Sequence, residues 1–140
     1  MNDYLFKTTA INKDGGKGIA YIKDGMIIPL DHFNQKERLG SNPEELFALA
    51  WATCLHSTLK LLLRAKNMTN ESEVRVQVFL KLNRETKRYY FDVYGEIEIK
   101  GLELDEMEKI IAETDSRCPI SQLIADKPTV HLKASKFTGE

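Results

Sequence analysis

The chain has 140 residues, 42% of them hydrophobic, which suits a single domain over residues 1–140 with a substantial core. Its formal net charge is −1 and its basic residues are scattered, so we expect no nucleic-acid partner. The polar beginning is unlike a signal peptide, and no apolar run reaches the roughly twenty residues that span a bilayer. We therefore expect a cytoplasmic protein with no membrane partner, in which two cysteines indicate redox or catalytic chemistry.

Three short strands are predicted before residue 31, over residues 4–11, 18–23 and 26–30. Asp24 and Gly25, between the last two, form a typical two-residue hairpin turn. These strands predict a small meander, followed by a polar connection up to the next element.

The central feature is a long helix, predicted from residue 43 to about residue 66. Ser41 or Asn42 can cap it, Pro43 fits its first turn, and Ser41 has capping-box spacing to Glu44. Between residues 46 and 55 nearly every side chain is apolar, which predicts a helix buried on all sides. One sheet covers only one side of such a helix, so we expect a second subunit to cover the other.

The rest of the chain predicts a long hairpin, a helix and a final strand. Apolar and polar residues alternate over residues 74–82 and 91–99, as in half-buried strands. An amphipathic helix follows and ends near residue 117, and Cys118 then precedes Pro119, which indicates a new helix start. With a last strand over residues 129–137, this order favours an α+β class over repeated βαβ units.

Two motifs give a more specific indication. The run Ser41-Asn42-Pro43-Glu44-Glu45-Leu46-Phe47-Ala48 with Cys54, and Cys118-Pro119-Ile120-Ser121 further on, resemble the OsmC/Ohr family of thiol-dependent peroxidases, which reduce organic hydroperoxides. The resemblance covers most of the chain. It implies antiparallel sheets wrapped around a long buried central helix in an intertwined homodimer with its sites near the interface. It also implies a dithiol reductant such as a lipoylated protein, with no metal or organic cofactor.

Cys54 is the candidate nucleophile. A free cysteine on an apolar helix is also, by itself, an ordinary small buried side chain. Because a thiol with an unperturbed pKa near 8.5 is about 3% ionised at pH 7, and burial lowers that fraction, a reactive Cys54 needs a nearby cation. The resemblance makes Cys118 the resolving cysteine; the alternative is an unreactive thiol before a proline turn.

The resemblance also implies an arginine held by Glu44, although an acid in a first turn is an ordinary partner of the helix dipole. Two positions of this chain can supply the cation: Lys17, in the glycine-rich turn, and Arg38, in the loop before the helix. We favour Arg38, because a guanidinium can pair with a carboxylate through two hydrogen bonds and an ammonium cannot. Either charge can instead be an ordinary exposed one, so the choice stays open.

Phe47 and Trp51 are expected to form an apolar wall that favours organic peroxides over hydrogen peroxide. The predicted reaction passes through a Cys54 sulfenic acid and a Cys54–Cys118 disulfide. Two alternatives remain: a redox-sensing or small-apolar-ligand-binding dimer with little turnover, and a hydrolase with a cysteine nucleophile. The three histidines lie too far apart in the sequence for a local metal-binding pattern.

Overall fold

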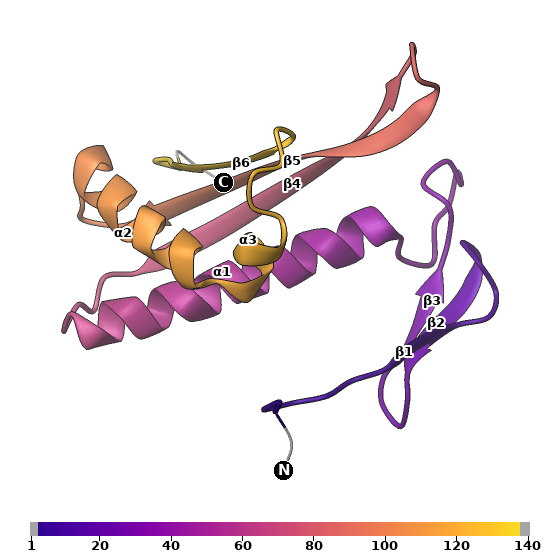
Figure 1. Ribbon diagram of the computed structural model, residues 1–140, viewed down its shortest axis with the longest axis horizontal. Helices are drawn as coiled ribbons and strands as arrows, with labels where there is room; N and C mark the ends of the chain where they lie inside the picture. The colour runs from indigo at the N-terminus through magenta and orange to yellow at the C-terminus, as the bar shows by residue number, and fades with distance from the viewer. Residues whose placement is uncertain (1–2, 138–140) are drawn as a thin grey trace. The chain divides into compact units, whose positions relative to one another are not determined.

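The structure is a computed structural model that describes residues 3–137. Its elements are β1 (Ala10–Asn12), β2 (Gly18–Ile22), β3 (Ile27–Leu30), α1 (Pro43–Ala65), β4 (Ser72–Asn83), β5 (Arg88–Ile99), α2 (Leu104–Arg117), α3 (Pro119–Leu123) and β6 (Val130–Ala134) (Figure 1). The chain forms two compact units, one within residues 1–46 and the other within residues 47–140. The single domain over residues 1–140 stays a prediction.

The first unit holds the predicted meander. β2 pairs antiparallel with both β1 and β3, and Asp24, with φ of 60°, makes the turn between β2 and β3. The strand predicted over residues 4–11 is much shorter, because only Ala10–Asn12 pairs with β2. Asn12 ends it by accepting hydrogen bonds from the backbone N–H groups of Asp14 and Gly15, at 3.1 and 2.7 Å.

α1 begins at Pro43, as predicted, and Asn42 is its cap. The Asn42 Oδ1 atom accepts the backbone N–H of Glu45 at 2.9 Å. The predicted capping box between Ser41 and Glu44 is wrong, because Asn42 occupies the cap position. Ser41 instead donates its hydroxyl to Glu45 Oε1 at 3.1 Å.

The second unit contains a three-stranded sheet in the order β4-β5-β6. β4 and β5 form the predicted antiparallel hairpin, in register from Ser72 opposite Ile99 to Asn83 opposite Arg88. β6, however, runs parallel to β5, so the expectation of wholly antiparallel sheets is wrong for this strand. The reason is the crossover through α2 and α3, which returns the chain to the middle of β5, so that β6 begins opposite Val93 and runs in the same direction.

α1 runs along this sheet and supplies much of the core (Figure 1). Four of its buried side chains pack against β5, α2 and the segment around Cys118; they are Trp51, Leu55, Leu59 and Leu63, and Leu62 is buried as well. The ring of Trp51 fits beneath Gly95, where a Cβ atom would lie 3.1 Å from two ring carbons. The core is therefore built around the part of α1 that follows Phe47.

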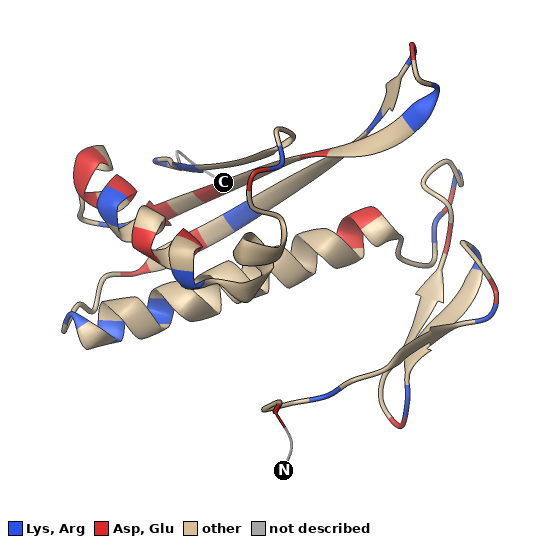
Figure 2. Cartoon of the chain, in the orientation of Figure 1, with Lys and Arg blue, Asp and Glu red and all other residues tan. Residues whose placement is uncertain are grey.

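The other side of α1 is open in the single chain, and the prediction that a second subunit covers it stays a prediction. Leu49 and Leu61 are 65% and 61% exposed. Figure 2 shows charged residues on α1 only toward its two ends. Within residues 3–137, α1 alone has the length and hydropathy of a membrane span, which the sequence reading did not foresee, although core helices share that composition. The absence of a membrane partner stays a prediction.

Candidate active site

Two thiols 64 residues apart in sequence meet in the second unit. The Cys118 thiol donates to Cys54 Sγ at a distance of 2.9 Å between the sulfur atoms, and neither cysteine is in a disulfide. Cys118 is fully buried and Cys54 is half-buried on α1. The two sulfurs lie close enough to react with each other after only a small movement.

The sequence after Cys118 fixes its position. Pro119 opens α3, and Cys118 is the cap residue, whose sulfur accepts the backbone N–H of Ser121 at 3.4 Å. This confirms the helix start predicted from the Cys118–Pro119 pair. The backbone N–H of Ile120 donates to Cys54 Sγ, so the same short segment contacts both sulfurs.

The surroundings of Cys54 favour the neutral thiol. Burial raises its pKa above the ordinary value, and the hydrogen bond with Cys118 raises it further. The Ile120 N–H opposes both effects by stabilising the thiolate. None of the described groups that act on this pKa is a cation. The second unit thus brings the two sulfurs together, while no cation among the described residues acts on the pKa of Cys54.

The first unit contains the two candidate cations, and only Arg38 is paired. Its Nη1 and Nη2 atoms donate to Oε1 and Oε2 of Glu45 at 3.0 and 2.9 Å. The predicted pairing with Glu44 is therefore wrong: Glu45 hydrogen-bonds Arg38, while Glu44 acts on it only through its charge. The Glu45 hydrogen bond raises the pKa of Arg38, and the Arg38 hydrogen bond lowers the pKa of Glu45.

Lys17 lies in a well-defined turn but is exposed. Asp14 accepts the backbone N–H of Ile19 at 2.9 Å, which closes the turn around Lys17. No carboxylate in the part of the chain that the structure describes lies within ion-pair distance of its ammonium. The ammonium of Lys17 is thus not held in one orientation by any described carboxylate, whereas the guanidinium of Arg38 is fixed by two hydrogen bonds.

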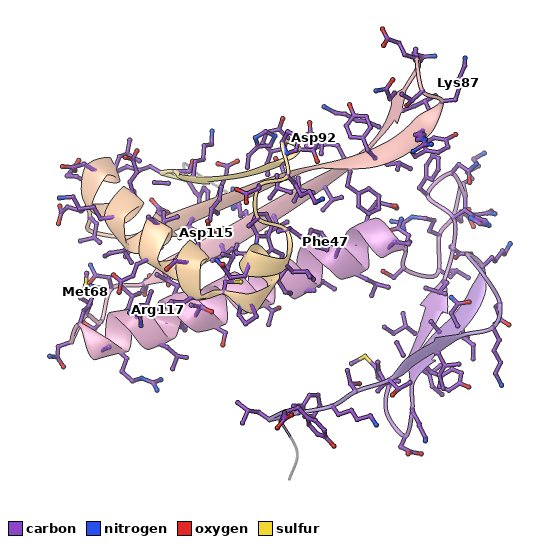
Figure 3. The ribbon with its side chains drawn as sticks, viewed as in Figure 1. Phe47, Met68, Lys87, Asp92, Asp115 and Arg117 are labelled. Carbon is purple, nitrogen blue, oxygen red and sulfur yellow. The ribbon has the colours of Figure 1, made fainter. Side chains whose placement is uncertain are left out.

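The two expected wall residues differ in accessibility. Phe47, which Figure 3 labels near the start of α1, is half-buried, and its ring centroid lies 6.4 Å from that of Trp51. Trp51 is only 1% exposed, and its indole N–H donates to the hydroxyl of Ser121 at 2.9 Å. In this chain Trp51 lies in the core, and its hydrogen bond to the segment after Cys118 was not predicted from the sequence.

Sequence reasoning also gave no role to Ser121 or to the backbone N–H of Ile120. A serine three residues after a capping cysteine has the spacing at which a cap contacts the third helical residue, and that signal points to Ser121. No group of three His, Cys, Asp or Glu side chains within residues 3–137 is arranged to hold a metal ion. The chemistry available to the described site is that of two thiols.

The chain is similar to proteins of known sequence and structure. The chain is 26% identical to the organic hydroperoxide resistance protein OhrA of Bacillus subtilis, over 97% of this chain and all of the relative. A provisionally assigned redox protein from Lactobacillus casei has a structure that matches with a TM-score of 0.89 and 29% identity, covering 99% of this chain and 96% of that one.

The fold is shared more widely. The structure of the organic hydroperoxide resistance protein OhrB of Bacillus subtilis matches with a TM-score of 0.84, over 94% of this chain and 100% of that one. At 23% identity, this likeness shows the fold alone. A family model described as OsmC-like protein matches residues 34–133, which include Arg38, Cys54 and Cys118. The chain therefore belongs to the OsmC-like protein family.

Proposed function

We propose that this protein is a thiol-dependent peroxidase that reduces organic hydroperoxides to alcohols. The observation that carries the proposal is the 2.9 Å approach of the Cys54 and Cys118 sulfurs in the core of the second unit. Curated relatives of similar length are named organic hydroperoxide resistance proteins, which supports the substrate class. No metal or organic cofactor enters the proposed reaction.

The proposed reaction has three steps. The Cys54 thiolate attacks the O–O bond of the hydroperoxide, which breaks to leave a Cys54 sulfenic acid and an alkoxide that takes a proton to become the alcohol. The Cys118 thiol then attacks the sulfenic sulfur, forming the Cys54–Cys118 disulfide and releasing water. An external dithiol, such as a lipoylated protein, reduces the disulfide and is itself oxidised.

The first step needs a cation, because burial holds the pKa of Cys54 above its ordinary value. We assign this role to Arg38, held by Glu45, with Lys17 as the alternative. The two-point contact with Glu45 leaves other guanidinium N–H groups free to donate to the thiolate and to the departing oxygen. Both cations belong to the first unit, of this chain or of a second copy.

A homodimer is part of the proposal. A row of exposed side chains with four-residue spacing runs along α1: Leu49, Thr53, Ser57 and Leu61. Leu49 and Leu61 are large apolar residues left in water, and a second subunit would bury them. Phe47, half-buried near the same stretch of α1, remains the residue expected to contact the organic part of the substrate.

The test is a thiol titration of the reduced protein before and after one equivalent of cumene hydroperoxide. A peroxidase loses two thiols per subunit at once and regains them when a dithiol is added. A cysteine hydrolase loses none at that dose, and a ligand-binding or sensing dimer without turnover loses them slowly or not at all. Cys54→Ser, a nearly isosteric change, should abolish peroxide consumption; unchanged consumption would remove Cys54 from the mechanism.

A further inference from the structure

The only tryptophan of the chain makes a buried hydrogen bond that joins α1 to α3. Trp51 Nε1 donates to Ser121 Oγ at 2.9 Å, with Trp51 1% and Ser121 4% exposed. Among the described residues, the other contacts of this kind between α1 and the Cys118–α3 segment both involve the Cys54 sulfur, which meets the Cys118 thiol and the Ile120 N–H. The bond therefore lies where it can set the position of α3 relative to α1.

Each member of this bond is three residues from a cysteine. Trp51 precedes Cys54 by about one helical turn, and Ser121 follows Cys118 by three residues. Ser121 also donates its backbone N–H to Cys118 Sγ at 3.4 Å, so one residue contacts both the indole and the second sulfur. A shift of Ser121 would move Cys118 with it.

The packing beside this bond is incomplete. A cavity of about 190 Å³ lies there, lined by Trp51 and Ser121 and by residues of α2, the loop after α3 and β6, namely Asp115, Ile124, Ala125, Asp126, Lys127, Val130 and Leu132. α3 itself has five residues, too few for a helix that is stable alone. Its position thus depends on contacts with its neighbours. Gln122 donates its side-chain N–H to the Asp115 carbonyl of α2 at 3.1 Å, in an exposed hydrogen bond, whereas the Trp51–Ser121 hydrogen bond to α1 is buried.

We propose that Trp51 and Ser121 are positioning residues for disulfide closure, holding Cys118 against Cys54. This inference rests on the proposed peroxidase function. Once Cys54 is a sulfenic acid, Cys118 displaces water from it to form the disulfide. The competing reaction is a second hydroperoxide that oxidises the sulfenic acid to a sulfinic acid and becomes an alcohol. A misplaced Cys118 slows the first reaction and leaves the second untouched.

The direct test uses Ser121→Ala in the full-length protein, treated with cumene hydroperoxide and quenched at intervals for mass spectrometry. Sulfenic acid formation should stay within about twofold of wild type, because Ser121 contacts the sulfur of Cys118 and not that of Cys54. Closure should slow by about tenfold, the usual scale for losing one buried hydrogen bond. The peroxide concentration that converts half of Cys54 to sulfinic acid should fall by a similar factor.

Three further variants separate positioning from general damage. Trp51→Phe removes the donor of the same hydrogen bond. The double variant, Trp51→Phe with Ser121→Ala, should close the disulfide only slightly more slowly than either single variant. Ser121→Thr keeps the hydroxyl, has the adjoining cavity for its methyl group, and should restore closure. Ser116→Ala, which removes an exposed hydroxyl bonded to the Glu113 carbonyl, is the matched control and should be silent.

A redox-buffer titration tests the placement without peroxide. The equilibrium between the dithiol and the disulfide in a dithiothreitol buffer should shift toward the dithiol by about tenfold in Ser121→Ala, or about 30 mV. If wild type forms this disulfide in the buffer but does not react with peroxide, the proposed function fails and the positioning role is still measured. Unchanged closure and an unchanged equilibrium in both Ser121→Ala and Trp51→Phe would overturn the inference, as would equal slowing of both chemical steps.

Discussion

Arg38 and Glu45 face each other through two nearly parallel hydrogen bonds of 3.0 and 2.9 Å. Glu45 also accepts the Ser41 hydroxyl at 3.1 Å, so its carboxylate is held from two sides. The pair thus presents a guanidinium of fixed orientation just before α1. Such a donor can stabilise charge on a thiolate and on a leaving oxygen more effectively than a mobile ammonium can.

The first prediction separates the two candidate cations. Arg38→Lys keeps the charge but loses the two-point contact, and it should slow oxidation of Cys54 by about a hundredfold, the usual scale for losing one oriented donor. Lys17→Met should cost much less, because no described carboxylate orients its ammonium. The measurement is the second-order rate of Cys54 oxidation, with the thiolate pKa followed by ultraviolet absorbance. A damaging Lys17→Met beside a silent Arg38→Lys would reverse the assignment.

A companion prediction concerns the two glutamates. Glu45→Gln should lower the same rate markedly, and Arg38→Lys added to it should have little further effect, because the two residues form one unit. Glu44→Gln is the matched control, one residue away on the same helix turn. If Glu44→Gln proves the more damaging change, the carboxylate implied by the family motif is the functional one and the Arg38–Glu45 pair is only structural.

The elements that depend on local patterns were predictable. The alternation of apolar and polar residues predicted the β4–β5 hairpin. Asn42 and Pro43 predicted the start of α1, and Cys118 with Pro119 predicted the start of α3. Each of these signals lies within a few residues of the feature it predicts. The approach of the two thiols was predicted as well, but from the family resemblance rather than from any property of the residues between them.

The features that depend on distant contacts were not predictable. β6 runs parallel to β5 because of where the crossover leaves the chain, and no strand pattern records that direction. Arg38 meets Glu45 rather than Glu44 because neighbouring helical residues point about 100° apart, and the cap at Asn42 decides which one faces the loop. The hydrogen bond of Trp51 was not predictable because its partner, Ser121, is 70 residues away.

The second prediction concerns assembly. The purified protein should be a dimer at micromolar concentration, since Leu49 and Leu61 are largely exposed on α1 of the single chain. Changing both to glutamate should shift it to a monomer, because each change would bury a carboxylate in an apolar interface. Leu104→Glu, on α2 and already 46% exposed, is the control and should leave the dimer intact. Sedimentation velocity gives the answer; a wild-type monomer would contradict the prediction.

The third prediction concerns acid stability and a cluster on the sheet. Asp92, which Figure 3 labels on β5, accepts from Lys81 Nζ at 2.6 Å and from the Tyr94 hydroxyl at 3.1 Å, and its other oxygen lies 3.1 Å from His131 Nε2. The hydrogen bond from Lys81 is the main cause that lowers the pKa of Asp92 in the folded protein. The carboxylate therefore stabilises the fold above its unfolded pKa of about 3.9, and that contribution disappears as the pH falls through the lowered folded value.

Asp92→Asn should accordingly lower the free energy of unfolding at pH 7, and the difference from wild type should shrink as the pH drops below about 4. Urea unfolding at pH 7, 5 and 3 measures it. Glu108→Gln, an exposed change on α2 at a side chain with no ion pair among residues 3–137, should show no such pH-dependent difference. A difference between Asp92→Asn and wild type that stays constant from pH 7 to pH 3 would contradict the prediction.

The fourth prediction tests the packing beneath β5 that places Trp51. A Cβ atom at Gly95 would lie 2.9 Å from Leu132 Cδ1 and 3.1 Å from two carbons of the Trp51 ring, so Gly95→Ala overpacks the core. We expect a loss of about 1–2 kcal/mol in the free energy of unfolding, because overpacking outweighs the small gain from replacing a strand glycine. Leu132→Val removes the nearer obstacle and, combined with Gly95→Ala, should cost less than the two single losses added together. Urea unfolding of wild type, the two single variants and the double variant gives the coupling free energy between the two positions. Strictly additive losses, or a Gly95→Ala variant more stable than wild type, would show that the Trp51 ring has room to move.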